Sequence, residues 1–441
     1  MNVLVTGAML ETACQKPVPS RKGLEKRFAL NAAPSAESKF TMKLNRLFLT
    51  LAALAQLAPA ALAQPESMAS IFSNANNNVS ASTVVPRRSS IIFIACDGLG
   101  FGDLSCYGQT NFQTPNLDKL ATEGTRFTNC RVAGDGLDLA QAALMTGKNS
   151  AFTSGETTLA ERLKQAGYHT GLLGEWVLGT EPWTQGFNEF AGFVDEREAR
   201  NYFPEAIWRY APNSIYDESN KTVHAWVGRE TIHDNAGGMK KRYSVDILTS
   251  AAANFIRINQ PDFANHYQPF FLLLNLPAPR SATEGKDDFP VPTDAPYSGE
   301  SWPQAAKNRA AMIARLDEGV GRLIEQLNKQ RMTNNVAIFF TAAAAPPKFA
   351  NTNLNFLKAP GEVRGGNSEE RLRVPMIVRW PEHVPAGRVS KQPWSGVDFA
   401  PTAMQIAHAK IPPSFGGISM LPALLGEPKT NSPTAPDSRG P

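Results

Sequence analysis

Few residues in this 441-residue chain have both a reactive side chain and a place in the sequence that is typical of a catalytic or ligand-binding site. The clearest is Asp97, which follows the uninterrupted apolar run 91–96 and precedes Gly98. A carboxylate at the end of a buried strand lies where α/β proteins gather their ligands, and it could help to hold a hard cation. Such a cation takes about six to eight oxygen ligands, so a lone aspartate with water or carbonyls would bind it weakly.

The cysteines and histidines offer no metal site of their own. Cys14 precedes the cleavage site expected below, which leaves Cys96, Cys106 and Cys130. No C-x-x-C pair occurs and the six histidines are scattered, so zinc is unsupported. Three cysteines in an exported chain are compatible with one disulfide and a free thiol, or with three buried apolar side chains.

Uninterrupted apolar runs predict the strands that position these residues. Strands buried on both faces are expected at 91–96, 269–276, 335–341 and 374–378. Because ligand sites form at the carboxyl ends of parallel strands, the loops after Cys96, Leu276 and Thr341 are the expected location of any site.

Helical patterns lie between these strands. They are expected at 114–124, 158–167 and, with a single apolar stripe, 310–327. Buried strands alternating with amphipathic helices predict an α/β fold, a three-layer sandwich with a largely parallel central sheet. Residues 180–240, rich in Trp, Tyr, Asn and Gly, are expected to form an extended excursion from it.

The basic charge of the chain is concentrated at its N-terminus. The formal net charge is +4, but residues 1–63 hold eight basic and three acidic side chains, which leaves 36 basic and 37 acidic side chains in the remainder. Within 42–63, basic residues precede an apolar stretch that ends in Ala61-Leu62-Ala63, the pattern of a secretory signal peptide. Gln56 and Pro59 leave about ten clean apolar residues, whereas a membrane-spanning helix needs about 20. We therefore expect a secreted or periplasmic protein without stable membrane insertion and, since the remainder is nearly neutral, no nucleic-acid partner.

Composition divides the chain into five parts. They are a mis-assigned N-terminal extension (1–41), the signal peptide (42–63), a disordered linker (64–88), the α/β domain (89–426) and a disordered Pro/Ser/Thr-rich tail (427–441).

The segments described so far resemble the sulfatase family of the alkaline-phosphatase superfamily. The matching segments, in order, are IIFIACDGLGFGDLSCYG with QTPNLDKLATEGTRFTN, TLAERLKQAGYHTGLLGEWVLG, LDEGVGRLIEQLNKQRMTNNVAIFFT, RVPMIVRWPEHVPAGRVS and SGVDFAPTAMQIAHAKIP. They span roughly residues 89–427. Members of this family commonly continue into a small antiparallel C-terminal subdomain, and since nothing resembling it follows Gly426, we expect it to be missing.

The resemblance implies a nucleophile that this chain lacks. In the family, a Cys or Ser in a C-x-P-S-R stretch is converted to formylglycine and attacks a sulfate ester. That stretch precedes A-A-L-x-T-G, here 142–147, so the resemblance places Leu137 at the nucleophile, Leu139 at the proline and Gln141 at the arginine. Leucine has no lone pair, and no cysteine lies in a C-x-P-x-R context, so we expect no formylglycine.

The family's metal loops are also changed. The resemblance places the paired aspartates of the first loop at Asp97 and Gly98, and the Asp and Asn of the second at Ala343 and Ala344. Asp97 is then a residual structural carboxylate or a vestigial metal ligand. We expect no cofactor, with weak residual calcium binding at most.

The cationic side chains that face sulfate in the family are partly replaced. Glu175 stands at the position of a lysine, Val177 and Arg280 at those of two histidines, and Arg364 near that of a late lysine. Glu175 would repel a sulfate oxygen. It is expected either to form a salt bridge with Arg280 or Arg364 or to be solvated independently.

These losses predict an exported pseudo-sulfatase in which sulfate-ester hydrolysis is lost and which acts as a binding or regulatory module, with a sulfated or other glycan as its partner. The alternative is a sulfuric-ester or phosphoric-ester hydrolase of the same superfamily with a rebuilt metal site that uses Asp97 and Asp138. A third hypothesis is a carbohydrate-binding surface built from aromatic side chains, namely Trp208, Tyr210, Tyr216 and Trp226.

Overall fold

The computed structural model of the chain describes residues 88–134, 136–217, 221–260, 268–282, 289–344 and 372–426. The predicted extension 1–41, signal peptide 42–63 and tail 427–441, together with all but the last residue of the linker 64–88, lie outside the described residues.

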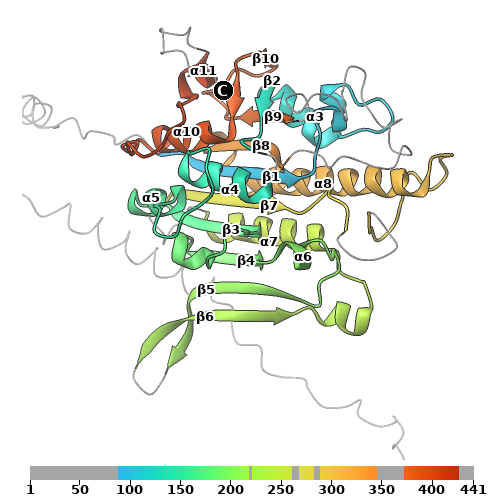
Figure 1. Ribbon diagram of the computed structural model, residues 1–441, viewed down its shortest axis with the longest axis horizontal. Coiled ribbons are helices and arrows are strands. Elements are labelled where there is room, and N and C mark those ends of the chain that lie inside the picture. Colours follow the sequence, from blue (N-terminus) through green and yellow to red (C-terminus); the bar gives the residue numbers. More distant parts are fainter. Residues whose placement is uncertain are drawn as a thin grey trace, which may run out of the picture. The chain divides into compact units, whose positions relative to one another are not determined.

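One mixed sheet organises the described chain (Figure 1). Its strands are β1 (Ser90–Asp97), β2 (Thr125–Arg131), β3 (His169–Glu175), β4 (Glu189–Phe193), β5 (Ala206–Asp217), β6 (Thr222–Thr231), β7 (Phe270–Leu276), β8 (Val336–Ala344), β9 (Arg373–Arg379), β10 (Arg388–Ser390) and β11 (Trp394–Ser395). Their order across the sheet is β10-β2-β9-β8-β1-β7-β3-β4-β5-β6, and β11 pairs with β2.

The centre of the sheet is parallel, as predicted. Strand β1 pairs in parallel with β7 on one side and with β8 on the other, and β7 pairs in parallel with β3. All eight residues of β1 are buried, which explains its uninterrupted apolar run. Antiparallel pairs occur around β9 and in the series β4-β5-β6, where the β5–β6 hairpin forms one edge of the sheet (Figure 1).

Helices cover both faces of the sheet, in agreement with the predicted three layers. They are α3 (Pro115–Thr122), α4 (Leu137–Thr146), α5 (Leu159–Gln165), α6 (Glu196–Ala199), α7 (Ser244–Ile258), α8 (Gln304–Lys329), α10 (Phe399–Ile406) and α11 (Leu421–Leu425). In β7, Phe270 packs edge-to-face on Phe255 of α7, and the next residue, Phe271, packs on Phe399 of α10. Because successive strand residues point to opposite faces, α7 and α10 belong to opposite layers.

Buried polar side chains fix several element ends. Asp317 of α8 accepts hydrogen bonds from the backbone N–H groups of Asn116 (3.1 Å) and Leu117 (2.8 Å), so one helix caps the first turn of another. Thr158 and Glu161 form a capping box at the start of α5.

The three cysteines of the described chain, Cys96, Cys106 and Cys130, are free thiols. Cys96 and Cys130 are buried and Cys106 is partly buried, so the predicted disulfide alternative is wrong for these residues. Burial raises the pKa of Cys106 and of Cys130 to about 12, which keeps both as neutral thiols. No helix within the described ranges is long and apolar enough to cross a membrane.

Candidate functional site

Most positions assigned by sequence to one site lie together at the carboxyl end of the parallel strands. Asp97 is the last residue of β1, Glu175 the last of β3, and Ala343 and Ala344 close β8. Arg280 follows β7 by a short loop. The sheet topology β8-β1-β7-β3 makes these strand ends neighbours, while Arg364 lies outside the described residues.

Asp97 is a fully buried ion-pair partner, with 0% of its surface exposed. Arg280 Nη1 donates a hydrogen bond to its Oδ1 at 3.1 Å, and Arg200 Nη2 lies 3.6 Å from Oδ2. Burial raises the pKa of Asp97, and the two guanidinium groups oppose this shift. Arg200, which directly follows α6, also pairs with Glu196. One guanidinium therefore faces each carboxylate oxygen.

Glu175 is equally buried but has no such partner. Its exposed fraction is 0%, and among the described residues neither carboxyl oxygen has a hydrogen-bond partner. Burial raises its pKa well above the usual range, and the negative charge of Asp97 adds to this shift. The expected salt bridge from Glu175 to Arg280 is wrong, because Arg280 pairs with Asp97 instead. The structure favours a neutral Glu175 carboxyl group.

Gln141, at the position of the family's arginine, holds the loop that follows β3. Its Nε2 donates to the backbone oxygen of Glu175 at 3.0 Å, and its Oε1 accepts from the backbone N–H of Val177 at 2.8 Å. Asn275 Nδ2 donates to the same Glu175 oxygen at 2.9 Å. Both the donor and the acceptor of the Gln141 side-chain amide therefore bond to backbone groups of the protein.

The position assigned to the nucleophile is occupied by an inert side chain. Leu137 begins α4 and is only 5% exposed. The neighbouring Asp138 is exposed, so it does not join Asp97 in a buried cluster. No group of three or more His, Cys, Asp or Glu side chains suited to a metal occurs within the described ranges, which leaves the rebuilt metal site without support there.

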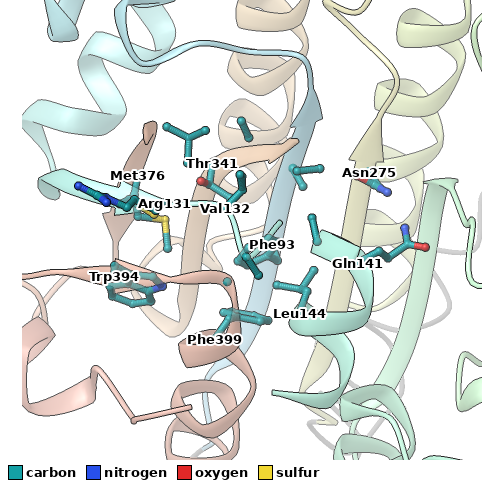
Figure 2. Close-up of a pocket in the computed structure, with 18 residues that line it drawn as sticks. Phe93, Arg131, Val132, Gln141, Leu144, Asn275, Thr341, Met376, Trp394 and Phe399 are labelled. Carbon is teal, nitrogen blue, oxygen red and sulfur yellow. The ribbon is translucent and has the colours of Figure 1, made fainter. Parts of the chain in front are cut away.

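A small apolar cavity of about 40 Å³ lies between α4, α10 and the ends of β1 and β8 (Figure 2). The labelled side chains around it are mainly apolar and aromatic, with the Gln141 and Asn275 amides on one side. Ala343 also lines it. A volume of this size holds about one or two waters rather than a sulfated sugar.

The residues present do not fit the calcium ion that the sulfatase resemblance implies. Asp97 is the one carboxylate among the four assigned loop positions, because Gly98, Ala343 and Ala344 have no side-chain oxygen. The Gly98 N–H and the Ala344 carbonyl bond to each other at 3.3 Å. Two guanidinium groups already face the Asp97 oxygens and would repel a divalent cation.

Comparison with known proteins decides the family. The Sulfatase family model matches residues 89–409, most of the chain. The chain belongs to the sulfatase family. Among sulfatases with related sequences, N-acetylgalactosamine-6-sulfatase of Canis lupus familiaris is 28% identical over 79% of this chain and 68% of its own. N-acetylglucosamine-6-O-sulfatase of Bacteroides thetaiotaomicron is 25% identical over 78% and 72%.

Solved structures share the fold. The structure of Ps i-CgsB in complex with k-i-k-neocarrahexaose has a TM-score of 0.58 and 27% identity, covering 77% of this chain and 76% of that one. The PsFucS1 sulfatase from Pseudoalteromonas sp. has a TM-score of 0.59 at 22% identity, covering 83% and 77%.

Sequence reasoning missed the residues that complete the buried cluster. Arg200 and Tyr202 lie in the excursion 180–240, which carried no periodic signal. The Tyr202 hydroxyl donates to the backbone oxygen of Pro277 at 2.8 Å and also to that of Arg280. Tyr202 therefore anchors the loop that presents Arg280 to Asp97.

Proposed function

We propose that this sulfatase-family protein no longer hydrolyses sulfate esters and acts as an exported binding or regulatory module. One observation carries the proposal: the position assigned to the nucleophile is Leu137, a buried side chain without a heteroatom. Sulfate transfer requires an attacking lone pair close to positive charge. Here the lone pair is missing, and Arg280 and Arg200 are directed at Asp97.

The electrostatics beside Leu137 support the same proposal. A neutral or negative Glu175 replaces a positive charge, and Val177 cannot donate from its side chain. The amide of Gln141 is bonded to backbone groups of the loop after β3. A sulfate group entering this space would meet the Arg131 side chain of the cavity lining, but neither the lysine nor the histidine of the family.

We propose a sulfated or other glycan as the partner, because the related sequences are named as sulfatases of amino sugars. The cavity near Gln141 is too small for one. A cleft of about 460 Å³ lies on the α7 side of the sheet, between α7 and strands β4 to β6. This volume falls in the usual range of small-molecule sites, about 300–1,000 Å³. Its floor includes Leu173, Ile207 and Phe255.

The charges of this cleft suit a ligand that is bound mainly through hydroxyl and amide groups. Arg209 pairs with Glu230 at 2.9 Å, and Arg242 lies 3.7 Å from Asp234. Trp183 and Tyr210 stack on each other at 5.5 Å, so this part of the aromatic excursion is used in internal packing. The cleft is therefore a better candidate than an exposed aromatic surface.

The experiment separates binding from hydrolysis on one probe. The full chain is incubated with a labelled oligosaccharide ending in N-acetylgalactosamine 6-sulfate, and bound and free sugar are analysed by mass spectrometry. We expect retention of the sugar with its mass unchanged, weakened by Arg209→Ala but not by Lys329→Ala, an exposed residue at the end of α8 that does not line the cleft. Loss of one sulfate from the sugar would refute the proposed loss of hydrolysis, and no retention would refute the glycan partner.

A further inference from the structure

Gly98, which directly follows β1, lies in close contact with Arg280. Gly98 has φ +82°, a left-handed conformation that favours glycine. A Cβ atom at this position would lie 3.2 Å from Arg280 Cα and 3.3 Å from its Cδ. Any side chain at residue 98, including a second aspartate, would therefore crowd the backbone of Arg280.

The Arg280 backbone has little freedom to move away. Its N–H donates to Pro277 O at 3.3 Å, and its carbonyl accepts from the hydroxyl of Tyr202, whose side chain is fully buried. The Gly98 carbonyl in turn accepts from Arg309 Nη2 at 3.3 Å. Both sides of the contact are held by buried groups, so the space between them is fixed.

Two arginine side chains of the protein itself balance the negative charge of Asp97. Arg280 faces Oδ1 at 3.1 Å and Arg200 faces Oδ2 at 3.6 Å, while the Arg200 side chain is 14% exposed and the Arg280 side chain 21% exposed. Together they supply two positive charges, the charge of one divalent cation, on the two faces of the carboxylate. Burying an aspartate without such charges would be strongly unfavourable.

We propose that Arg280, assisted by Arg200, is a built-in counter-cation that takes the place of a divalent metal. In this account, Gly98 and Arg280 form a matched pair, because a side chain at residue 98 would crowd Arg280 and would strain a backbone with φ +82°. The loops at the carboxyl ends of β1 and β7 then keep their structure without a bound metal. This inference concerns the metal requirement and does not depend on the proposed loss of hydrolysis.

The pairing predicts opposite effects for single and double substitutions. Arg280→Gln should lower the melting temperature because Asp97 loses its closest positive charge. Adding Asp97→Asn should recover most of that loss, since a neutral amide needs no counter-ion. Arg257→Gln on the exposed side of α7 is the matched control and should leave the melting temperature nearly unchanged.

A second pair of variants tests the shared space. Gly98→Asp alone should lower the melting temperature in calcium and in chelator, because the introduced Cβ atom would lie 3.2 Å from Arg280 Cα and the backbone has φ +82°. Gly155→Asp is the matched variant, because Gly155 has φ +90° but no atom within 4 Å of its Cβ position, and it should lower the melting temperature less than Gly98→Asp does.

The experiment is a thermal unfolding series on the full chain in millimolar calcium and in chelator, followed by circular dichroism. We expect the wild-type melting temperature to be the same in both solutions. A wild-type melting temperature that rises with calcium would overturn the proposal, as would a Gly98→Asp variant as stable as the wild type. If the protein hydrolyses a sulfate ester while its melting temperature is the same in calcium and in chelator, only the proposed function is contradicted. The proposed function and the proposed counter-cation can therefore fail separately.

Discussion

The side chain of Gln141 spans the loop after Glu175, donating to the Glu175 carbonyl at 3.0 Å and accepting from the Val177 N–H at 2.8 Å. A residue at the position of the arginine of the C-x-P-S-R stretch thus stabilises the backbone of the loop that carries a lysine and a histidine elsewhere in the family. This bridge links α4 to the end of β3. Because both bonds are made to backbone atoms, Gln141 fixes the course of this loop without contacting the carboxyl group of Glu175.

Replacing Gln141 should destabilise the protein. Gln141→Leu keeps the size of the side chain but removes the hydrogen bond to the partly buried Val177 N–H, which costs about 0.5–1.5 kcal/mol. Urea unfolding followed by fluorescence measures this loss. Gln165→Leu at the exposed end of α5 is the control, and an equal effect of both variants would mean that the bridge contributes nothing specific.

Glu175 should make stability depend on pH. Its pKa is raised in the folded protein, so the folded state retains a proton that the unfolded chain releases above its ordinary pKa of about 4.3. The free energy of unfolding therefore falls as the pH rises from that value towards the folded pKa. Glu175→Gln should remove this fall, raising the melting temperature at pH 7 but not at pH 4.

The control for Glu175→Gln is Glu318→Gln on the exposed side of α8, which removes the same charge from the surface. Surface substitutions of this kind usually change stability by less than about 0.5 kcal/mol. Thermal unfolding from pH 4 to pH 8 gives the comparison. A Glu175→Gln variant less stable than the wild type at pH 7 would show that the carboxylate is charged and usefully paired.

The ion pair between Arg309 and Asp103 should be among the most costly to break. Both side chains are fully buried, and the guanidinium contacts the carboxylate through two bonds of 2.8 and 2.6 Å. Asp103→Asn leaves a buried arginine without its counter-charge, which should cost about 3–5 kcal/mol in urea unfolding. The exposed pair Arg209–Glu230 offers the contrast, since Glu230→Gln should cost less than about 1 kcal/mol.

Restoring the family's nucleophile motif should not restore hydrolysis. A variant with Leu137→Cys, Leu139→Pro and Gln141→Arg supplies the sequence context for formylglycine, but Gly98, Glu175 and Ala343 still lack the metal ligands and positive charge. We expect no arylsulfate turnover even when mass spectrometry detects the converted cysteine. The single variant Leu137→Ser, which lacks this sequence context, is the unconverted control, and turnover by the triple variant would show that the rest of the site is functional.

The central strands and the long helix could be predicted because their burial leaves a direct pattern in the sequence. Continuous apolar runs predicted β1 and β7, and a regular apolar stripe predicted α8, although its ends lie several residues further out. The β5–β6 hairpin was missed, because most side chains of β6 are exposed and carry no alternation. Strand β2 mixes Thr, Arg and Asn with few apolar residues, so it gave no signal either.

The candidate site was only partly predictable for a related reason. Asp97, Glu175 and Arg280 follow strands, so topology alone brings them to one edge of the sheet. Side-chain geometry decides which of these charged groups form an ion pair. The sequence does not indicate that Arg280 pairs with Asp97 and not with Glu175. Arg200 could not be predicted, because it reaches Asp97 from a short helix within an aperiodic segment.

The measurement that tests the central claim most directly is turnover of a fluorogenic arylsulfate by the purified full chain, with calcium, magnesium, manganese or zinc present. The account predicts product formation equal to that in buffer for every metal, and no difference between wild type and Asp97→Ala. Turnover above buffer by the wild type with any of these metals would contradict it, whether or not Asp97→Ala, which also breaks the buried ion pair with Arg280, abolishes that turnover.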